Sequence, residues 1–384
     1  MLGGSSGALF PRNCSSRFQS LPLGTLHSTH RNLYSKSIVP ISSRQRALIA
    51  AGILLGVVAG GAGVYFYRLR GNLASPVAGR APDLLRQLPA DAPVVAYLDV
   101  AALRGLQHSP WAALLGLTSP GPRVDREYAE FVRQTGFDYS RDLDRLAIAL
   151  WPEGFSSSGR LAGETRILSI ADGRFDEKKI AAYALRTGRA VPRGARVVYE
   201  IPGAPPAALE FQSPQRISLA GGGNPSSVLA DSGAGAPDAA MRARIERVAG
   251  APMFAVARTV NLPPSFYANF KSLPEFDRAA RSVRSLSLAG QPDGDNIKLA
   301  LDAECDSAKS ALELATLLDG FRFFGGVALA DPETRRQMTP EQWTFLKALL
   351  DHVKVTHQNQ WVRLALDITP EMLEAPSSSA AARR

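Results

Sequence analysis

Strict alternation of apolar and polar residues constrains the fold of this chain more than any other feature of its sequence. In residues 297–302, Ile297, Leu299 and Leu301 alternate with lysine, alanine and aspartate, and residues 362–368 follow the same pattern. Successive side chains of a strand point to opposite faces, so such a strand has one buried and one solvated face. Strands of this kind are typical of antiparallel sheets, whereas the strands of a doubly wound parallel sheet are apolar throughout.

Helical periodicity between the strands completes the fold prediction. Asp176 is expected to cap one helix, Gly320 to end the helix whose apolar stripe begins at Ala308, and Thr339 to open another in a capping box with Gln342. The order strand, helix, strand, strand, helix, strand recurs in both halves, so we predict two α+β lobes of split βαβ (ferredoxin-like) type, at 83–235 and 236–374. The predicted strands are Val94–Val100, Leu146–Leu150, Arg166–Ala171, Arg196–Ile201, Ala208–Gln212, Arg216–Ala220, Pro252–Val260, Ser285–Ala289, Asn296–Ala303 and Val362–Ile368.

An uncharged apolar run precedes the lobes. Residues 47–67 form a stretch of 21 residues without Asp, Glu, Lys or Arg, with Arg44 and Arg46 before it and Arg68 and Arg70 after it. As a helix it would be about 31 Å long, which matches a bilayer core. The run therefore predicts a single N-terminal transmembrane helix, between a basic disordered segment (1–46) and a linker (68–82). The tail 375–384 is expected to be disordered.

Three glycines in this run share one helix face. Gly52, Gly56 and Gly60 lie four residues apart, a spacing that lets two membrane helices approach closely. Two interpretations stay open: a homodimer contact inside the bilayer, or the general abundance of glycine in membrane helices.

The basic charge is confined to the N-terminal part of the sequence. The formal net charge is +9, but residues 1–70 hold eight of the 44 Lys and Arg and no acid, which leaves 36 basic against 35 acidic residues. A nearly neutral folded part argues against nucleic-acid binding. We expect a bacterial inner-membrane protein with a periplasmic C-terminal part; the alternative is the mitochondrial inner membrane.

The first lobe resembles uncharacterised single-pass envelope proteins of bacteria. The similarity rests on the hydrophobic pattern of LPADAPVVAYLDV (88–100), FDYSRDLDRLAIAL (137–150) and ILSIADGRFDEKKIAAY (167–183). It implies a membrane-anchored envelope protein and supplies no catalytic residues.

No motif predicts a catalytic, cofactor or metal site. The two cysteines and five histidines have no zinc spacing. Asp351, His352 and His357 could together bind a cation, but an exposed helix end, where a histidine is favoured by the helix dipole, is the preferred explanation. Asp138, Asp142 and Asp144 alternate with Arg141 and Arg145, which predicts a self-neutralising turn rather than an acid–base site.

Two further features remain as candidates. Phe321, Phe323 and Phe324 precede two glycines; they form either an exposed apolar loop that docks onto a membrane or partner, or part of the core. Cys305 is expected to be a small buried hydrophobic residue.

The function expected from the sequence is non-enzymatic. We predict a membrane-anchored extracytoplasmic interaction or scaffold protein, bound to the lipid bilayer through residues 47–67 and to an envelope protein or polymer. The alternatives are an envelope hydrolase with scattered carboxylates and a lipid-binding protein. Converging carboxylates with perturbed pKa values in a deep cleft would favour the hydrolase, and a shallow, evenly charged surface would favour the interaction protein.

Overall fold

The fold is taken from a computed structural model. It describes residues 81–104, 126–155, 161–162, 164–203, 205–231, 237–268, 270–271, 273–294, 296–369 and 372. All of them belong to one compact unit.

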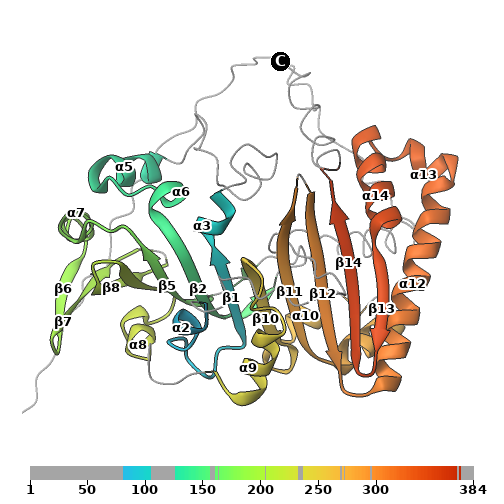
Figure 1. Ribbon diagram of the computed structural model, residues 1–384, viewed down its shortest axis with the longest axis horizontal. Helices are drawn as coiled ribbons and strands as arrows, with labels where there is room; N and C mark the ends of the chain where they lie inside the picture. Colours follow the sequence, from blue (N-terminus) through green and yellow to red (C-terminus); the bar gives the residue numbers. More distant parts are fainter. Residues whose placement is uncertain are drawn as a thin grey trace, which may run out of the picture. The chain divides into compact units, whose positions relative to one another are not determined.

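Within these ranges, twelve strands form one antiparallel sheet (Figure 1). Its order is β13-β14-β12-β11-β10-β1-β2-β5-β9-β8-β7-β6. The strands are β1 (Val94–Asp99), β2 (Leu143–Trp151), β5 (Arg166–Gly173), β6 (Arg189–Arg193), β7 (Arg196–Ile201), β8 (Ala207–Ser213), β9 (Arg216–Gly221), β10 (Met253–Arg258), β11 (Val283–Asp293), β12 (Asn296–Cys305), β13 (Lys354–Gln358) and β14 (Trp361–Ile368). A separate hairpin pairs β3 (Gly154–Phe155) with β4 (Leu161–Ala162).

Helices bury opposite faces of the sheet in its two halves. In the first half, the side chains of Val95, Ala149 and Leu168 pack against α2, α8 and α9. In the second half, Leu299 and Leu366 point to the other face and pack against α14, and Ala303 and Val362 pack against α12. The helices are α2 (Ala81–Leu85), α3 (Val100–Leu103), α5 (Arg126–Thr135), α6 (Tyr139–Asp142), α7 (Glu177–Ala184), α8 (Pro225–Ala230), α9 (Ala239–Glu246), η3 (Thr259–Asn261), α10 (Ser265–Ala268), α11 (Pro274–Ser282), α12 (Ala308–Ala330), α13 (Pro332–Arg336) and α14 (Pro340–His352).

The two halves follow the same path. In the first, β1, β2 and β5 form a meander, α7 leads to the outer edge at β6, and the chain returns until β9 pairs with β5. In the second, β10, β11 and β12 form the meander, α12–α14 lead to the edge at β13, and β14 pairs with β12. A bulge lies at the same place in each, between Leu143 and Arg145 and between Val283 and Ser285. The first half contributes two more strands to the sheet than the second half does.

The prediction of two split βαβ lobes is therefore wrong. That fold needs a crossover that places two strands parallel, and every strand pair in the described ranges is antiparallel. In addition, β1 pairs with β10, from Val94 opposite Ala257 to Leu98 opposite Met253, so the strands of both predicted lobes form one sheet. The predicted boundary near residue 235 falls between β9 and β10, and the predicted lobe limits stay a prediction.

The single-pass membrane architecture is also corrected. In the part of the chain that the structure describes, no helix combines the length and apolar character needed to cross a bilayer. The longest of the helices given above, α12, has 23 residues but carries charges at Lys309, Glu313, Asp319 and Arg322. The predicted anchor, residues 47–67 with Gly52, Gly56 and Gly60, lies outside the described residues.

Local predictions of helix starts are confirmed, and one helix end is wrong. Asp176 accepts a hydrogen bond from the Lys179 amide, and Thr339 and Gln342 form the predicted capping box. Gly320, by contrast, does not end its helix: α12 continues to Ala330, because Leu329 and the residues before it still pack onto the core.

Candidate functional site: an arginine-lined pocket

A row of alternating charges crosses four neighbouring strands in the first half of the sheet. Asp99 on β1 lies opposite Arg145 on β2, Arg145 lies opposite Asp172 on β5, and Asp172 lies opposite Arg216 on β9. Opposite charges at directly facing positions stabilise a strand pair. The row lies at the end of the strands, beyond the apolar positions Ala147 and Ile170 that fill the core on the same face.

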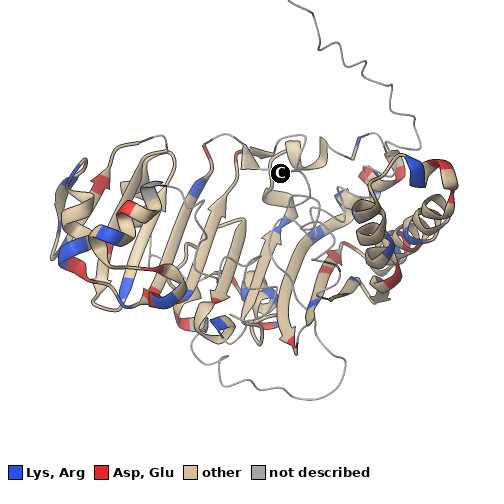
Figure 2. Cartoon of the chain, turned by 90° about the horizontal axis from the view of Figure 1, so that it is seen from above, with Lys and Arg blue, Asp and Glu red and all other residues tan. Residues whose placement is uncertain are grey.

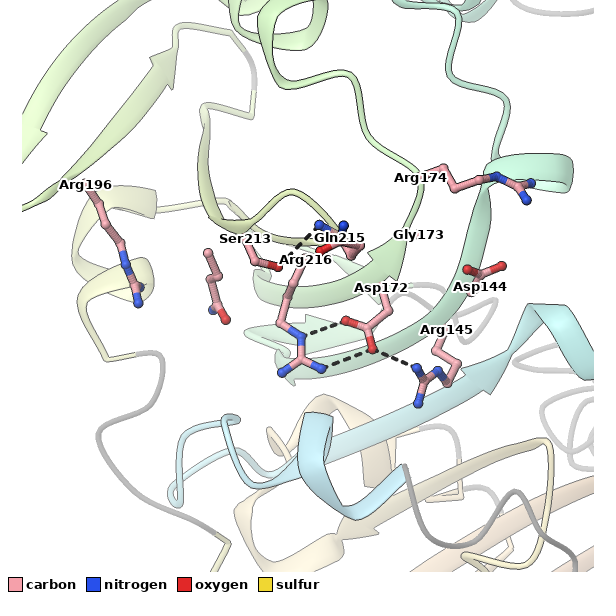
Figure 3. A pocket seen from close by; sticks show the side chains of 10 residues that line it. Asp144, Arg145, Asp172, Gly173, Arg174, Arg196, Ser213, Gln215 and Arg216 are labelled. Carbon is pink, nitrogen blue, oxygen red and sulfur yellow. Dashed lines mark hydrogen bonds and ion pairs between the residues drawn. The ribbon is translucent and has the colours of Figure 1, made fainter.

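Asp172 is the centre of this row. Its carboxylate accepts hydrogen bonds from Arg216 Nε (2.6 Å) and Nη2 (3.1 Å), and Arg145 Nη2 lies 3.2 Å from the same group (Figure 3). Asp172 is buried, at 7% exposure. Two guanidinium groups therefore share one buried carboxylate, and the bidentate contact holds Arg216 in a fixed orientation. The hydrogen bond to Asp172 raises the pKa of Arg216, so its charge is permanent.

An open pocket of about 470 Å³ lies over this pair. Its side chains come from β2, β5, β7, β8, β9 and the turns between them, and four of them are arginines against two aspartates (Figure 3). The lining consists of Asp144, Arg145, Asp172, Gly173, Arg174, Arg196, Gln212, Ser213, Gln215 and Arg216. The lining itself is therefore net positive and contains no large apolar side chain.

The outer arginines are held by acids behind the pocket. Arg196 pairs with Glu210 at 3.1 Å, and Arg174 pairs with Asp142 at 3.3 Å. Glu210 is only 3% exposed, so the carboxylate that holds Arg196 is itself withdrawn from solvent. This arrangement fixes positive groups around the opening without filling it.

The pKa shifts of several carboxyl groups are opposite to the shift that a general acid needs. A catalytic acid needs a raised pKa to hold its proton at neutral pH. Hydrogen bonds from Arg141 hold the pKa of Asp142 below its ordinary value, and hydrogen bonds from Ser226 and Arg189 do the same for Glu200. Every shifted carboxyl group in the described ranges has a lowered pKa. They are Glu130, Asp142, Asp176, Glu200, Glu304 and Asp306.

The candidates named from sequence fall in different places. Phe321, Phe323 and Phe324 lie on α12 and not in a loop; Phe321 packs into the core, whereas Phe323 and Phe324 are 66% and 68% exposed. Among the described residues, no group of His, Cys, Asp and Glu is placed to hold a metal ion. His352 contacts the Ala348 carbonyl at 2.7 Å.

Among the interleaved charges at 138–145, Asp142 and Arg141 pair with each other as the sequence predicts, whereas Arg145 pairs with Asp172 outside this segment. Asp138 caps α6, Asp142 pairs with Arg141 at 2.7 Å, and Asp144 pairs with Arg104 at 2.9 Å. Asp142 is only 7% exposed, so this turn is less solvated than expected.

Sequence reasoning missed the pocket. Arg145, Asp172 and Arg216 are far apart in the chain, and no local motif links them. Only the strand register brings them together. The one available signal was that each is a charged residue at the end of a strand with a strongly apolar core face.

Comparison with known proteins gives only remote structural similarity. No protein-family model and no curated protein sequence matches the chain. Among solved structures, crystal form III of TP0453 matches with 11% identity and a TM-score of 0.43, over 77% of this chain and 97% of that one. Crystal form IV of TP0453 matches with 11% identity and a TM-score of 0.40, over 79% of this chain and 100% of that one. At these scores the similarity defines neither a class nor a function for this chain.

Proposed function

We propose that this protein is a non-enzymatic binding protein whose arginine-lined pocket receives an anionic group of its ligand. The observation that carries the proposal is the sharing of the Asp172 carboxylate by Arg145 and Arg216 at the floor of an open pocket. Arg216 has a second counter-charge in Asp83, at 3.1 Å, whereas Arg145 shares the Asp172 carboxylate with Arg216. A carboxylate or phosphate group of a ligand would supply a further negative charge beside Arg145.

Arg145 is the group best placed to contact the ligand. A guanidinium group has five N–H donors, and the ion pair of Arg145 with Asp172 uses one end of it. Its side chain is 17% exposed, so it is partly desolvated yet still reachable from the pocket. A partly buried charge is screened less by salt than a surface charge, which strengthens its contact with an anion.

The alternatives inferred from sequence find less support. A hydrolase with a carboxylate site needs one carboxyl group of raised pKa near another that is ionised. The pKa of every shifted carboxyl group given above is lowered, and the Asp172 carboxylate already forms ion pairs with two arginines. A lipid carrier needs an apolar cavity, whereas charged and polar side chains line this pocket. Basic and acidic residues are also interspersed over the described part of the chain rather than separated into fields of one sign (Figure 2).

The test is a calorimetric titration of the full chain at low ionic strength, once with inorganic phosphate and once with acetate. We expect saturable binding with a dissociation constant on the order of millimolar, because a single anionic group supplies only part of a natural ligand. A preference for phosphate or for acetate identifies the class of anion.

Two variants make the titration decisive. Arg145→Gln removes the charge but leaves the Asp172–Arg216 pair, so we expect the fold to be retained and phosphate binding to fall at least tenfold. Arg336→Gln on α13, where the arginine side chain is 78% exposed, is the matched control and should bind as the wild type does. Equal affinity of the Arg145→Gln variant and the wild type would overturn the proposal.

A further inference from the structure

One position in the pocket breaks the alternation of charge along the sheet. The row of alternating charges places Arg145, Asp172 and Arg216 on the successive strands β2, β5 and β9. Beyond β9 follow β8 and β7, whose pocket-lining residues include Gln212 and Arg196. An acid in place of Gln212 would continue the alternation, because it would lie between two arginines. The neutral amide instead leaves a gap in the row where a negative charge fits.

Strand pairing puts Gln212 directly beside Arg216. A bulge in β8 makes Gln212 the extra residue next to Ser213, which lies opposite Arg216. The Gln212 side chain is on the same face of the sheet as Arg216, since its Nε2 atom donates a hydrogen bond to Ser218 Oγ at 2.6 Å. Ser218 is two residues from Arg216 on β9, and residues at that spacing share a face. Gln212 therefore lines the pocket next to Arg216.

Arg196 lies on the other side of Gln212. Val198 on β7 lies opposite Glu210 on β8. Arg196 precedes Val198 by two residues and Gln212 follows Glu210 by two, so in this antiparallel pair the two side chains are neighbours on the same face. Figure 3 shows Arg196 and Arg145 on opposite sides of the pocket. The arginines therefore extend from one side of the pocket to the other.

At the Arg196 end, the arginines outnumber the carboxylate that holds them. The Glu210 carboxylate lies 3.1 Å from Arg196 Nη1 and 3.6 Å from Arg193 Nη1. Arg193 Nη1 is buried and makes no hydrogen bond within the described part of the chain. One buried carboxylate thus faces two guanidinium groups, and the Arg196 side chain, at 53% exposure, also reaches the pocket. A further negative charge from a ligand is therefore favoured at this end.

We propose that the ligand carries two anionic groups and that the second of them lies over Gln212, between Arg216 and Arg196. This second site rests on the proposed function, in which the first anionic group contacts Arg145. Arg216 can take part because its hydrogen bonds to two aspartates use three of its five N–H groups. The uncharged Gln212 admits an anion that a glutamate at the same place would repel.

The strand spacing sets the length of the ligand. Neighbouring strands lie about 4.8 Å apart, so Arg145 on β2 and Gln212 on β8, three strands further, lie about 14 Å apart. A short dianion such as succinate cannot reach both positions at once. The pocket volume of about 470 Å³ is in the range of small-molecule sites. The ligand class is therefore an elongated small molecule with a carboxylate or phosphate group near each end.

Calorimetric titration of the full chain with linear dicarboxylates and linear bisphosphonates of increasing chain length tests the proposal. Acetate and methylphosphonate are the references with one anionic group. Linking two groups strengthens binding most when the linker matches the distance between their sites. We expect the best long dianion to bind at least about fivefold more tightly than its reference, and the shortest dianion at most about twofold more tightly, because it reaches one site at a time.

Gln212→Glu is the variant that locates the second site. The new carboxylate completes the row between two arginines and can accept a hydrogen bond from the Ser218 hydroxyl, so the fold should be retained. The ratio of affinities between the best dianion and its reference should fall to about two or less. Gln358→Glu, on the exposed part of the edge strand β13, adds the same charge elsewhere and should keep the wild-type ratio.

The outcomes separate the second site from the proposed function. If neither single anions nor dianions bind, both proposals are overturned. If acetate or methylphosphonate binds but no chain length improves on it by more than about twofold, the pocket receives one anionic group and the ligand with two groups is overturned. If the Gln212→Glu variant keeps the wild-type ratio, the second group does not lie over Gln212, and the proposed site is overturned as well.

Discussion

The Arg216 guanidinium group donates two hydrogen bonds to the Asp172 carboxylate on the adjacent strand, and the second half of the sheet contains the same arrangement. There, Arg363 on β14 donates from Nε and Nη2 to the two carboxylate oxygens of Asp302 on β12, both at 2.6 Å. In each half the aspartate lies on the third strand of the meander and the arginine lies on the strand that returns to pair with it. Both aspartates are buried, at 7% and 5% exposure. The pairs therefore fix the register where each half closes.

The pair at Asp172 makes a strong contribution to stability, which Asp172→Asn should reveal. The variant leaves Arg145 and Arg216 without their shared counter-charge in a largely buried position. Breaking such a pair from one side costs about 3 kcal/mol. We expect a loss of that size in the free energy of unfolding, measured by urea denaturation.

Asp319→Asn is the control for that measurement. The Asp319 side chain is 51% exposed and pairs with Arg322 on the surface of α12. Exposed pairs of this kind contribute less than about 1 kcal/mol. A similar small loss at Asp172 would mean that the charged row does not stabilise the sheet.

Stability should fall in acid through Asp142. Hydrogen bonds from Arg141 hold the pKa of Asp142 below its ordinary value, against the opposing effect of burial. A carboxyl group with a depressed pKa in the folded state stabilises the protein above its unfolded pKa of about 3.9, and this contribution is lost as the pH falls through the folded value.

The Asp142→Asn variant isolates that contribution. It cannot ionise, so the stability difference between wild type and variant should be full at pH 6 and should shrink below pH 4. Urea denaturation at both pH values measures it. A difference that stays constant with pH would show that ionisation of Asp142 does not stabilise the fold.

Local sequence signals predicted most of the elements but not how they pair. The alternation in β12 and β14 and the caps at Asp176 and Thr339 depend on near neighbours, which a sequence displays directly. The sequence did not predict the two edge strands of the sheet, because edge strands often contain proline and charged residues instead of alternating apolar ones. Strand β6 contains Pro192 and two arginines, and β13 is mostly polar.

The sequence alone did not predict which distant strands pair with each other. The contact of β1 with β10 joins segments more than 150 residues apart, and nothing in either strand specifies the other. The pocket has the same origin, since Arg145, Asp172 and Arg216 meet only through the strand register. The envelope location and the partners expected from the sequence stay a prediction.

Cys305 should behave as an inert thiol in the native protein. It is 1% exposed on β12, and burial raises the pKa of its thiol to about 11 from a reference of 9.0. The thiolate is the reactive form, so a rise of this size lowers its population about 100-fold at neutral pH.

Alkylation kinetics test that expectation in a Cys14→Ser variant, in which Cys305 is the remaining cysteine. Iodoacetamide at pH 8 should modify the native protein at least about 100-fold more slowly than the urea-unfolded chain. Comparable rates in the two states would show that β12 opens readily or that the thiol is accessible.

The capping box of α14 offers the last test, because each of its two hydrogen bonds can be removed separately. The Thr339 hydroxyl accepts a hydrogen bond from the Gln342 amide at 3.2 Å, and the Gln342 side chain accepts one from the Thr339 amide at 3.1 Å. The helix packs Leu349 into the core beneath it, so fraying at its start weakens that packing as well. Thr339→Ala should lower the free energy of unfolding by about 1 kcal/mol, and Thr339→Ser should restore most of it. Thr344→Ala, whose hydroxyl donates only to a carbonyl one turn earlier in the same helix, is the control and should have a much smaller effect. If Thr339→Ser were as destabilising as Thr339→Ala, the hydroxyl hydrogen bond would not be what stabilises the start of the helix.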